Sequence, residues 1–347
     1  MASQELNETL NLEYYISVYG STYLVDILYM YVLTPIAVIA FFLNILAYII
    51  FSKIQFTNAV IFNYLRLYVF NNSLLSLLLI TTFVNCTYRI FDFTNTYEAT
   101  FYGTYFMSPL ITILFFTASL LEICIIIERS SKFSQGLFNF LLIKNIKLTT
   151  LIIYVVSIII NIPVFFTNYP ENIDIGLSNS TFRLYYWGVS EFSVSLFGSI
   201  LTYSIYFIRD IVVLIIKIIL NILSVHLVKR YLYKIKVDVP ISQNNQNEIS
   251  ENQNNKPQKK YIGVTDRNLT YMAILMCIMS AFENFLFVAS NIYYTISINE
   301  ISTTIIFFSY FILAFKNSLN FFAFFFFNKS FNTELKNTLC LNLKTKN

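Results

Sequence analysis

Seven long apolar runs constrain this chain more than any other feature of its sequence. Each run is about as long as the 20-residue helix that crosses the hydrocarbon core of a bilayer, or longer. Strands of a membrane barrel would be short and would alternate polar with apolar residues, which runs such as 74–80 and 151–160 do not. Helices also satisfy their own backbone hydrogen bonds, as lipid requires. We therefore expect an all-α integral membrane bundle of seven helices, at residues 28–51, 61–84, 104–127, 148–167, 203–228, 269–296 and 301–327.

The composition excludes several classes of protein. Hydrophobic residues make up 56% of the 347 residues and charged residues only 12%, about half the share of a soluble domain. A soluble protein of this size could not bury so much apolar surface, so the chain is not expected to be a cytosolic enzyme, a secreted disulfide scaffold or a disordered protein. The net charge of +4 is small and most lysines flank the spans, so the expected partner is the lipid bilayer and not a nucleic acid.

Lysine and arginine residues predict the orientation, because cytoplasmic loops carry an excess of them. The N-terminal tail, residues 1–27, has none and contains four acidic residues. The connections on its side of the membrane hold only Arg89 and Arg183, whereas the other connections and the C-terminal tail, residues 328–347, hold seventeen basic residues. We expect the N-terminal tail outside and the C-terminal tail inside, with no cleaved signal peptide and the first span acting as the insertion signal.

Three glycosylation sequons fall in segments expected outside, at Asn7, Asn85 and Asn179. An asparagine-rich chain also produces sequons by chance, so both interpretations stay open. On the inner side, residues 240–260 are polar and almost free of apolar anchors, which predicts a disordered loop between the fifth and sixth spans. Such a loop would leave the sixth span free to move, as signalling requires, although membrane proteins tolerate loops of this kind generally.

The seventh span ends in a pattern that resembles a known motif. Asn320 is followed by Phe324, and Asn328-Lys329-Ser330-Phe331 begins the tail. This resembles rhodopsin-like G-protein-coupled receptors, in which Asn-Pro-x-x-Tyr precedes an Asn-Lys-x-Phe sequence that opens an amphipathic eighth helix. The spacing matches without a gap, but Phe321 stands in place of the proline and Phe324 lacks the tyrosine hydroxyl. The resemblance implies that Asn320 and Phe324 take part in activation.

The third span ends in Glu128-Arg129-Ser130, which resembles the Glu/Asp-Arg-Tyr motif of the same family. By this resemblance, Arg129 is restrained by Glu128 and by an acid of the sixth helix until that helix moves, and then engages a G protein. Asp266, just before the sixth span, is the expected second partner of Arg129. The alternative is an ordinary interfacial arginine that reaches lipid phosphates.

Other positions match the family only in part. Asn44 resembles the asparagine of its first helix and would hydrogen-bond to the second and seventh spans. Asn72 and Ser73 stand near the place where the family has an aspartate that helps to hold sodium, so no sodium site is expected. The Cys-Trp-x-Pro motif of the sixth helix is absent.

The cysteines also depart from the family. Residues 168–204 contain no cysteine, so the usual disulfide between the third helix and the second outer loop cannot form. Cys340 lies in a tail segment with Phe331, Leu335 and Leu339 at helical spacing, which predicts an interfacial helix. A cysteine at that place is a candidate for palmitoylation, and an unmodified thiol is the alternative.

Charged residues inside the spans are the last signal. An isolated charge in the membrane costs a few kcal/mol or more, so such residues face the interior and pair. We predict an ion pair between Glu283 and Lys316, with Glu122 as the competing partner of Lys316. Arg209, Asp210 and Lys217 are expected to form a separate cluster on the fifth span, and Arg209 and Asp210 are candidates for a ligand pocket.

These features predict a plasma-membrane receptor that transmits the signal of an extracellular ligand to a heterotrimeric G protein. A short Asn-Phe-Phe run slightly resembles invertebrate peptide receptors and chemoreceptors. A multi-pass transporter and a ligand-gated channel are the alternatives, although no internal repeat and no pair of Gly/Pro-broken helices favours a transporter. Enzymatic activity, a metal site and a cofactor are not expected, because His226 is the single histidine and has no second histidine or cysteine beside it.

Overall fold

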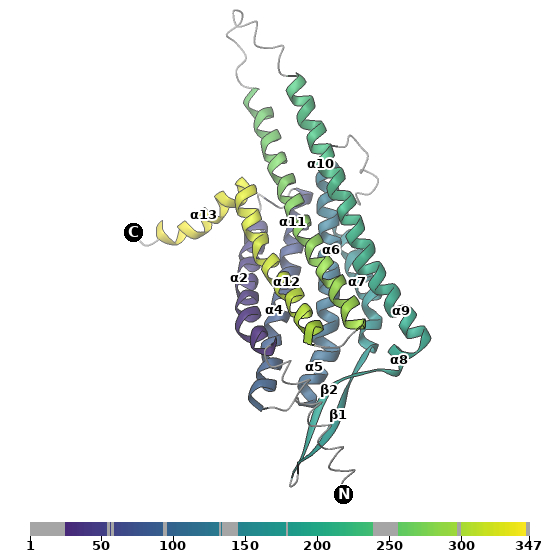
Figure 1. Ribbon diagram of the computed structural model, residues 1–347. Helices are drawn as coiled ribbons and strands as arrows, with labels where there is room; N and C mark the ends of the chain where they lie inside the picture. The colour runs from purple at the N-terminus through teal and green to yellow at the C-terminus, as the bar shows by residue number, and fades with distance from the viewer. Residues whose placement is uncertain are drawn as a thin grey trace, which may run out of the picture.

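Seven helices long and apolar enough to cross a membrane form the bundle in the computed structural model, which confirms the predicted all-α fold (Figure 1). The structure describes residues 25–53, 56, 59–92, 96–131, 133, 145–177, 180–238, 256–296 and 300–344. The chain is therefore a multi-pass membrane protein. Its spans are Val25–Phe51, Val60–Thr81, Tyr97–Ser131, Ile146–Phe166, Leu196–Arg230, Asn268–Ser290 and Thr304–Phe327.

Several spans combine more than one helical segment. The first two spans contain η1 (Tyr29–Leu33), α2 (Thr34–Phe51) and α4 (Val60–Asp92). The third and fourth contain α5 (Tyr97–Tyr102), η2 (Gly103–Met107), α6 (Ser108–Ser131), α7 (Ile146–Asn161) and η3 (Ile162–Phe166). The last three contain α9 (Leu196–Tyr206), η4 (Phe207–Val212), α10 (Val213–Asp238), α11 (Lys256–Ile296) and α12 (Glu300–Phe327), and α13 (Lys329–Lys344) follows them.

Polar side chains mark where several helices begin. Thr96, Asn145 and Ser195 each accept a hydrogen bond from a backbone N–H three residues later, which caps α5, α7 and α9. Asn328 does the same for Phe331 and separates α12 from α13. The Thr96 cap and the π-helical segment η2 explain why the third span begins at Tyr97, seven residues before the predicted start.

Two segments differ from the sequence prediction. The connection between α7 and α9 contains an antiparallel hairpin, β1 (Asn168–Leu177) and β2 (Ser180–Val189), in register from Asn168 opposite Val189 to Leu177 opposite Ser180. A short helix, α8 (Glu191–Val194), follows it. Helix α11 begins at Lys256, inside the segment 240–260 that the sequence predicts to be disordered, because helix-favouring lysine and glutamine residues extend α11 beyond the membrane.

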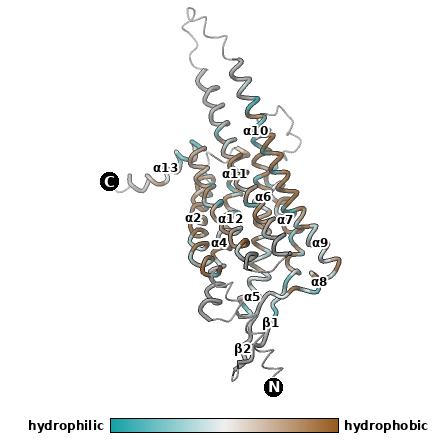
Figure 2. Tube along the Cα trace, viewed as in Figure 1, coloured by the Kyte–Doolittle hydropathy of each residue, from teal (hydrophilic) through white to brown (hydrophobic). Residues whose placement is uncertain are grey.

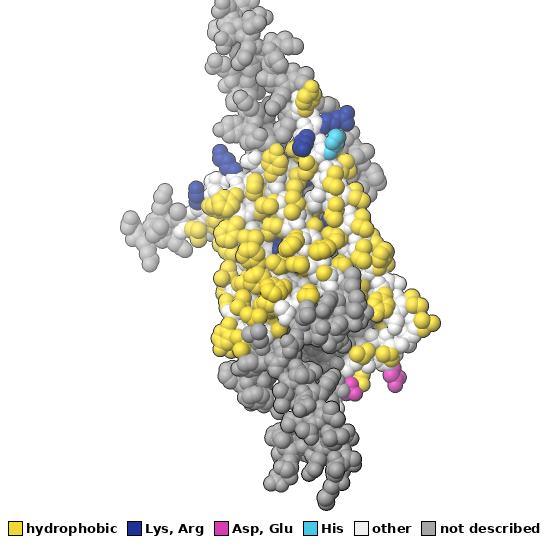
Figure 3. Space-filling view, in the orientation of Figure 1, with side chains coloured by type: hydrophobic (Ala, Val, Ile, Leu, Met, Phe, Trp, Pro, Cys, Tyr) yellow, Lys and Arg dark blue, Asp and Glu magenta, His cyan; other side chains and the backbone are white. Residues whose placement is uncertain are grey.

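Burial distinguishes a central helix from a peripheral one. In the membrane-spanning window of α6, 61% of the residues are buried, against 22% for α7. Many residues of the spans are coloured as hydrophobic in Figure 2, and apolar side chains cover most of the described surface of the bundle on the face shown in Figure 3. Helix α6 therefore lies where side chains from most other spans converge.

Among the described side chains, the exposed charges at the two ends of the bundle differ in sign (Figure 3). Exposed glutamates, Glu98 and Glu191, lie at the hairpin end, called the outer end below. The other end, called the inner end, carries the exposed basic residues Lys147, Lys229, Arg230, Lys329 and Lys336. Helix α13 projects sideways from the inner end (Figure 1).

Helix α13 is amphipathic, as predicted for the tail. Phe331 and Leu335 are buried in the same apolar core as Phe51 and Phe56, while Lys329 and Lys336 are exposed. This pattern suits a helix that lies in the membrane interface.

Candidate functional site

Four charged residues meet in the middle of the bundle, each from a different helix. They are Glu122 of α6, Lys217 of α10, Glu283 of α11 and Lys316 of α12, and we call them the charge cluster. Their exposed fractions are 1%, 0%, 0% and 4%. Two carboxylates and two ammonium groups make the cluster electrically neutral, which is the condition under which charges persist in an apolar interior.

The contacts alternate in charge along the cluster. Lys217 Nζ lies 2.9 Å from Glu122 Oε2, and Lys316 Nζ lies 2.9 Å from Glu122 Oε1. Lys316 Nζ also donates a hydrogen bond of 2.7 Å to Glu283 Oε2. The predicted Glu283–Lys316 ion pair is therefore present, and Glu122 binds Lys316 at the same time.

The sequence analysis grouped Lys217 with Arg209 and Asp210, but the structure separates Lys217 from that pair. Seven residues separate it from Asp210, and at a rise of roughly 1.5 Å per residue this places Lys217 about 10 Å deeper in the bundle. There its ammonium group donates hydrogen bonds to Ser119 Oγ of α6 (2.9 Å) and Ser280 Oγ of α11 (2.6 Å).

A tyrosine connects the charge cluster to two further residues. The Tyr68 hydroxyl of α4 donates a 2.6 Å hydrogen bond to Glu122 Oε1 and accepts a 2.9 Å bond from Asn320 Nδ2 of α12. Among the described residues, Glu122 thus receives donors from Tyr68, Lys217 and Lys316 and is also hydrogen-bonded by Ser280, whereas Glu283 is bound by Lys316. Sequence reasoning missed Tyr68, Ser119 and Ser280, because a tyrosine or serine in an apolar run carries no signal of its partner.

Asparagines form a second polar region between α2, α4, α6 and α12. Asn44 Nδ2 donates to the backbone oxygens of Ala40 (2.8 Å) and Asn317 (3.1 Å), which confirms its predicted contact with the seventh span. Asn72 is fully buried, and Ser73 donates to the Phe70 carbonyl within its own helix. Among the described residues, no hydrogen bond joins the Asn44 side chain to α4, so that part of the prediction is not met.

The inner end of α6 buries the pair expected to act in signalling. Glu128 and Arg129 are 6% and 4% exposed in the last turn of α6. The next residue, Ser130, forms a 2.5 Å hydrogen bond with Ser224 of α10, which fixes α6 against α10 at this level. Phe324 is fully buried and packs against Phe51 and Phe331, with ring centroids 5.2 and 5.8 Å away.

Arg209 and Asp210 pair with each other. Arg209 Nε and Nη2 donate to the two carboxylate oxygens of Asp210 at 2.6 and 2.8 Å. The guanidinium also reaches Asn161 Oδ1 at 3.4 Å and lies 5.0 Å from the Tyr206 ring centroid. Both charged residues belong to the π-helical segment η4, and such segments occur frequently at functional sites.

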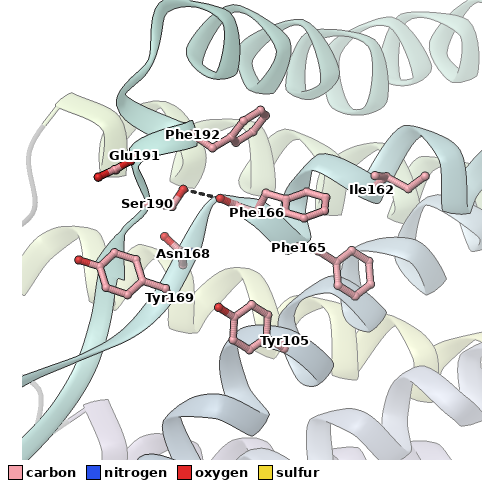
Figure 4. A pocket seen from close by; sticks show the side chains of 9 residues that line it. All are labelled: Tyr105, Ile162, Phe165, Phe166, Asn168, Tyr169, Ser190, Glu191 and Phe192. Atoms are coloured by element: carbon pink, nitrogen blue, oxygen red, sulfur yellow. Dashed lines mark hydrogen bonds between the residues drawn. The ribbon is translucent and has the colours of Figure 1, made fainter.

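An outer cavity of about 680 Å³ lies between the start of the third span, η3 and the hairpin (Figure 4). Aromatic side chains line most of it, with Glu191 as its charged residue. The Ser190 hydroxyl donates to the Phe166 carbonyl and closes the hairpin onto η3. Arg209 and Asp210 do not line this cavity, so it is distinct from the pocket that the sequence suggested.

Some predicted sites lie outside the described part of the chain. Asn7 and Asn179 are not among the described residues, and the side chains of Asn85, Asp266 and Cys340 are not described. Their predicted roles in glycosylation, restraint of Arg129 and palmitoylation stay predictions. Cys124 and Cys277 are free thiols inside the bundle.

Comparison with known proteins adds no identification, because no protein-family model and no curated protein matches the chain. The functional argument therefore rests on the fold and on the residues described above.

Proposed function

We propose that the chain is a divergent rhodopsin-like receptor of the plasma membrane, which transmits the signal of an extracellular ligand to a heterotrimeric G protein. One observation carries the proposal: Arg129 is buried at the inner end of the central helix α6, directly after Glu128. A guanidinium held at the mouth of a seven-helix bundle becomes available when neighbouring helices separate. Two contacts support the proposal: Asn320 donates a hydrogen bond to Tyr68 of α4, and Asn328 caps α13 directly after α12.

The surroundings of Arg129 fit this role. Helices α10 and α11 pack against α6, and α10 is joined to it by Ser130 and Ser224. Separation of α10 and α11 from α6 would uncover the last turn of α6 to the inner solution. A ligand that favours the separated arrangement would then shift the equilibrium between two states of the bundle.

The test is a cell assay with a promiscuous G protein and a panel of peptides and small chemosensory molecules. We expect Arg129→Ala to abolish the response at an unchanged surface level, because the coupling guanidinium is lost. Arg230→Ala, which removes an exposed arginine at the inner end of α10, is the matched control and should signal normally. Equal signalling by Arg129→Ala and the unaltered protein would contradict the assignment.

The charge cluster favours a second candidate, an ion-coupled transporter. Ionisable residues buried among transmembrane helices frequently mark ion pathways and proton relays. Purified protein in liposomes, loaded with a pH-sensitive dye, would distinguish the two functions. A proton flux that Glu122→Gln abolishes and Arg129→Ala leaves intact would favour the transporter.

A further inference from the structure

A buried polar stripe runs from the charge cluster toward the inner end, where α6, α10 and α11 pack together. On α10, Lys217, Asn221 and Ser224 are spaced four and three residues apart, so they share one face of the helix. On α11, the buried residues Ser280, Cys277 and Thr270 share a face in the same way. Neighbouring residues such as Ile222 and Ile278 are 67% and 57% exposed on the lipid side.

The two faces meet level by level. Lys217 binds Ser280, the Asn221 amide interacts with the Cys277 thiol one turn nearer the inner end, and Ser224 binds Ser130 of α6 at the next level. Ser224 Oγ donates to the Leu220 carbonyl, so Ser130 is the donor in the last contact. From Lys217 to Ser224 the stripe covers about 10 Å, at roughly 1.5 Å per residue. It ends beside Arg129, the residue before Ser130.

Two observations indicate that the stripe serves more than helix packing. Asn221 is 8% exposed, yet its side-chain oxygen has no hydrogen-bond partner within the described structure. Unsatisfied buried polar atoms are costly, and water is the usual partner that removes this cost. In addition, the hydrogen bond between Lys217 and Ser280 joins α10 to α11, but it supplies no counter-charge to Lys217. When that hydrogen bond breaks, Lys217 remains paired with Glu122, and Lys316 remains paired with Glu283.

We propose that this stripe is a solvent path, which admits water and protons from the inner end to the charge cluster. The hydrogen bond between Lys217 and Ser280 forms its deep end, where α10 and α11 can separate without stranding a buried charge. The proposal does not depend on G-protein coupling, since a receptor and a transporter could both contain such a path.

The test measures how fast silver ions reach single thiols in the full-length protein in inside-out vesicles. In a background in which serine replaces all four native cysteines, Asn221→Cys, Ser224→Cys and restored Cys277 are compared with two controls. Ile222→Cys faces lipid at a similar depth, and Met276→Cys is a buried apolar position beside Cys277. After each exposure to silver ions, the protein is dissolved in detergent and the thiols that have not reacted are alkylated. The fraction of thiol that silver protects from alkylation gives the rate of the silver reaction at each position.

We expect the three stripe thiols to react at least roughly tenfold faster than the controls, because hydration allows the reactive thiolate to form. Equal rates at stripe and control positions would overturn the proposal.

A blocking variant tests whether the path is continuous. Ser224→Leu should slow the reaction of Cys277 several-fold, whereas Ile222→Leu on the lipid face should not change it. An unchanged Cys277 rate in Ser224→Leu would show that the thiol is reached by another route, which would also overturn the proposal. Gel filtration of each variant shows that the bundle is folded.

Discussion

The charge cluster and the Arg209–Asp210 pair are both buried and both electrically neutral, but they are built in opposite ways. Arg209 and Asp210 are adjacent in sequence and satisfy each other within one turn of η4. The four residues of the charge cluster come from four helices, and Lys316 is shared between two carboxylates. The first arrangement neutralises a charge locally, whereas the second depends on how the helices are placed.

This difference has an energetic consequence. Replacing a buried ion pair with apolar groups is often neutral or stabilising, while removing one partner costs about 3–5 kcal/mol. Stability alone therefore does not explain why the bundle contains the charge cluster. It makes the energy of the bundle sensitive to movement between helices, and this property is the one that a receptor or a transporter uses.

The largest expected effect comes from breaking the charge cluster at one residue. Glu283→Gln or Lys316→Met should each destabilise the protein by about 3–5 kcal/mol, because each leaves an uncompensated buried charge. The double variant Glu283→Gln/Lys316→Met should recover most of that loss, since the Lys217–Glu122 pair remains. Thermal unfolding in detergent and surface expression measure both effects.

A second double variant is the matched control. Glu122→Gln/Lys316→Met has the same net charge, but it leaves Lys217 with only its serine partners and leaves Glu283 without Lys316. It should recover much less than the first double variant. If the two double variants were equally stable, net charge and not pairing would control the stability of the charge cluster.

The Arg209–Asp210 pair should respond differently. Arg209→Gln alone should destabilise by about 3 kcal/mol, because Asp210 stays buried without its counter-charge. Arg209→Gln/Asp210→Asn should recover most of that loss, since the two opposite charges of the pair are removed together. A double variant as unstable as the single one would show that the pair also holds η4 against other helices, and would remove the distinction drawn above.

The contribution of α4 to the charge cluster is smaller. Tyr68→Phe removes one of the donors to Glu122 and leaves Asn320 Nδ2 without the Tyr68 acceptor, which should cost about 1–3 kcal/mol. Tyr48→Phe, at a partly exposed tyrosine that packs beside Phe70, is the control and should change stability little. Equal unfolding temperatures for the two variants would show that the Tyr68 hydroxyl does not stabilise the charge cluster.

The sequence predicted the elements whose cause is local. Apolar runs of sufficient length define the helices, and the cost of an isolated charge predicted that Glu283 and Lys316 would pair. The pairing of Lys217 was mispredicted because the sequence analysis grouped it with Arg209 and Asp210, its neighbours along the fifth span, whereas its contacts are with Glu122, Ser119 and Ser280. The hairpin was missed because strand pairing depends on a partner segment and not on the segment itself.

The smallest effect is expected at the surface, where Lys53 bonds to Glu334 and to Thr338 of α13 (2.8 Å for the latter). Lys53 and Glu334 are 32% and 15% exposed, so water and salt screen their attraction, and such pairs contribute at most about 1 kcal/mol. Lys53→Ala should therefore lower the stability slightly at low salt and not at all at high salt. The losses in Glu283→Gln and Lys316→Met should persist at high salt, because salt does not reach the buried cluster. Unfolding temperatures at two salt concentrations test this, and a loss in Lys53→Ala that is independent of salt would mean that the alkyl chain of Lys53 positions α13.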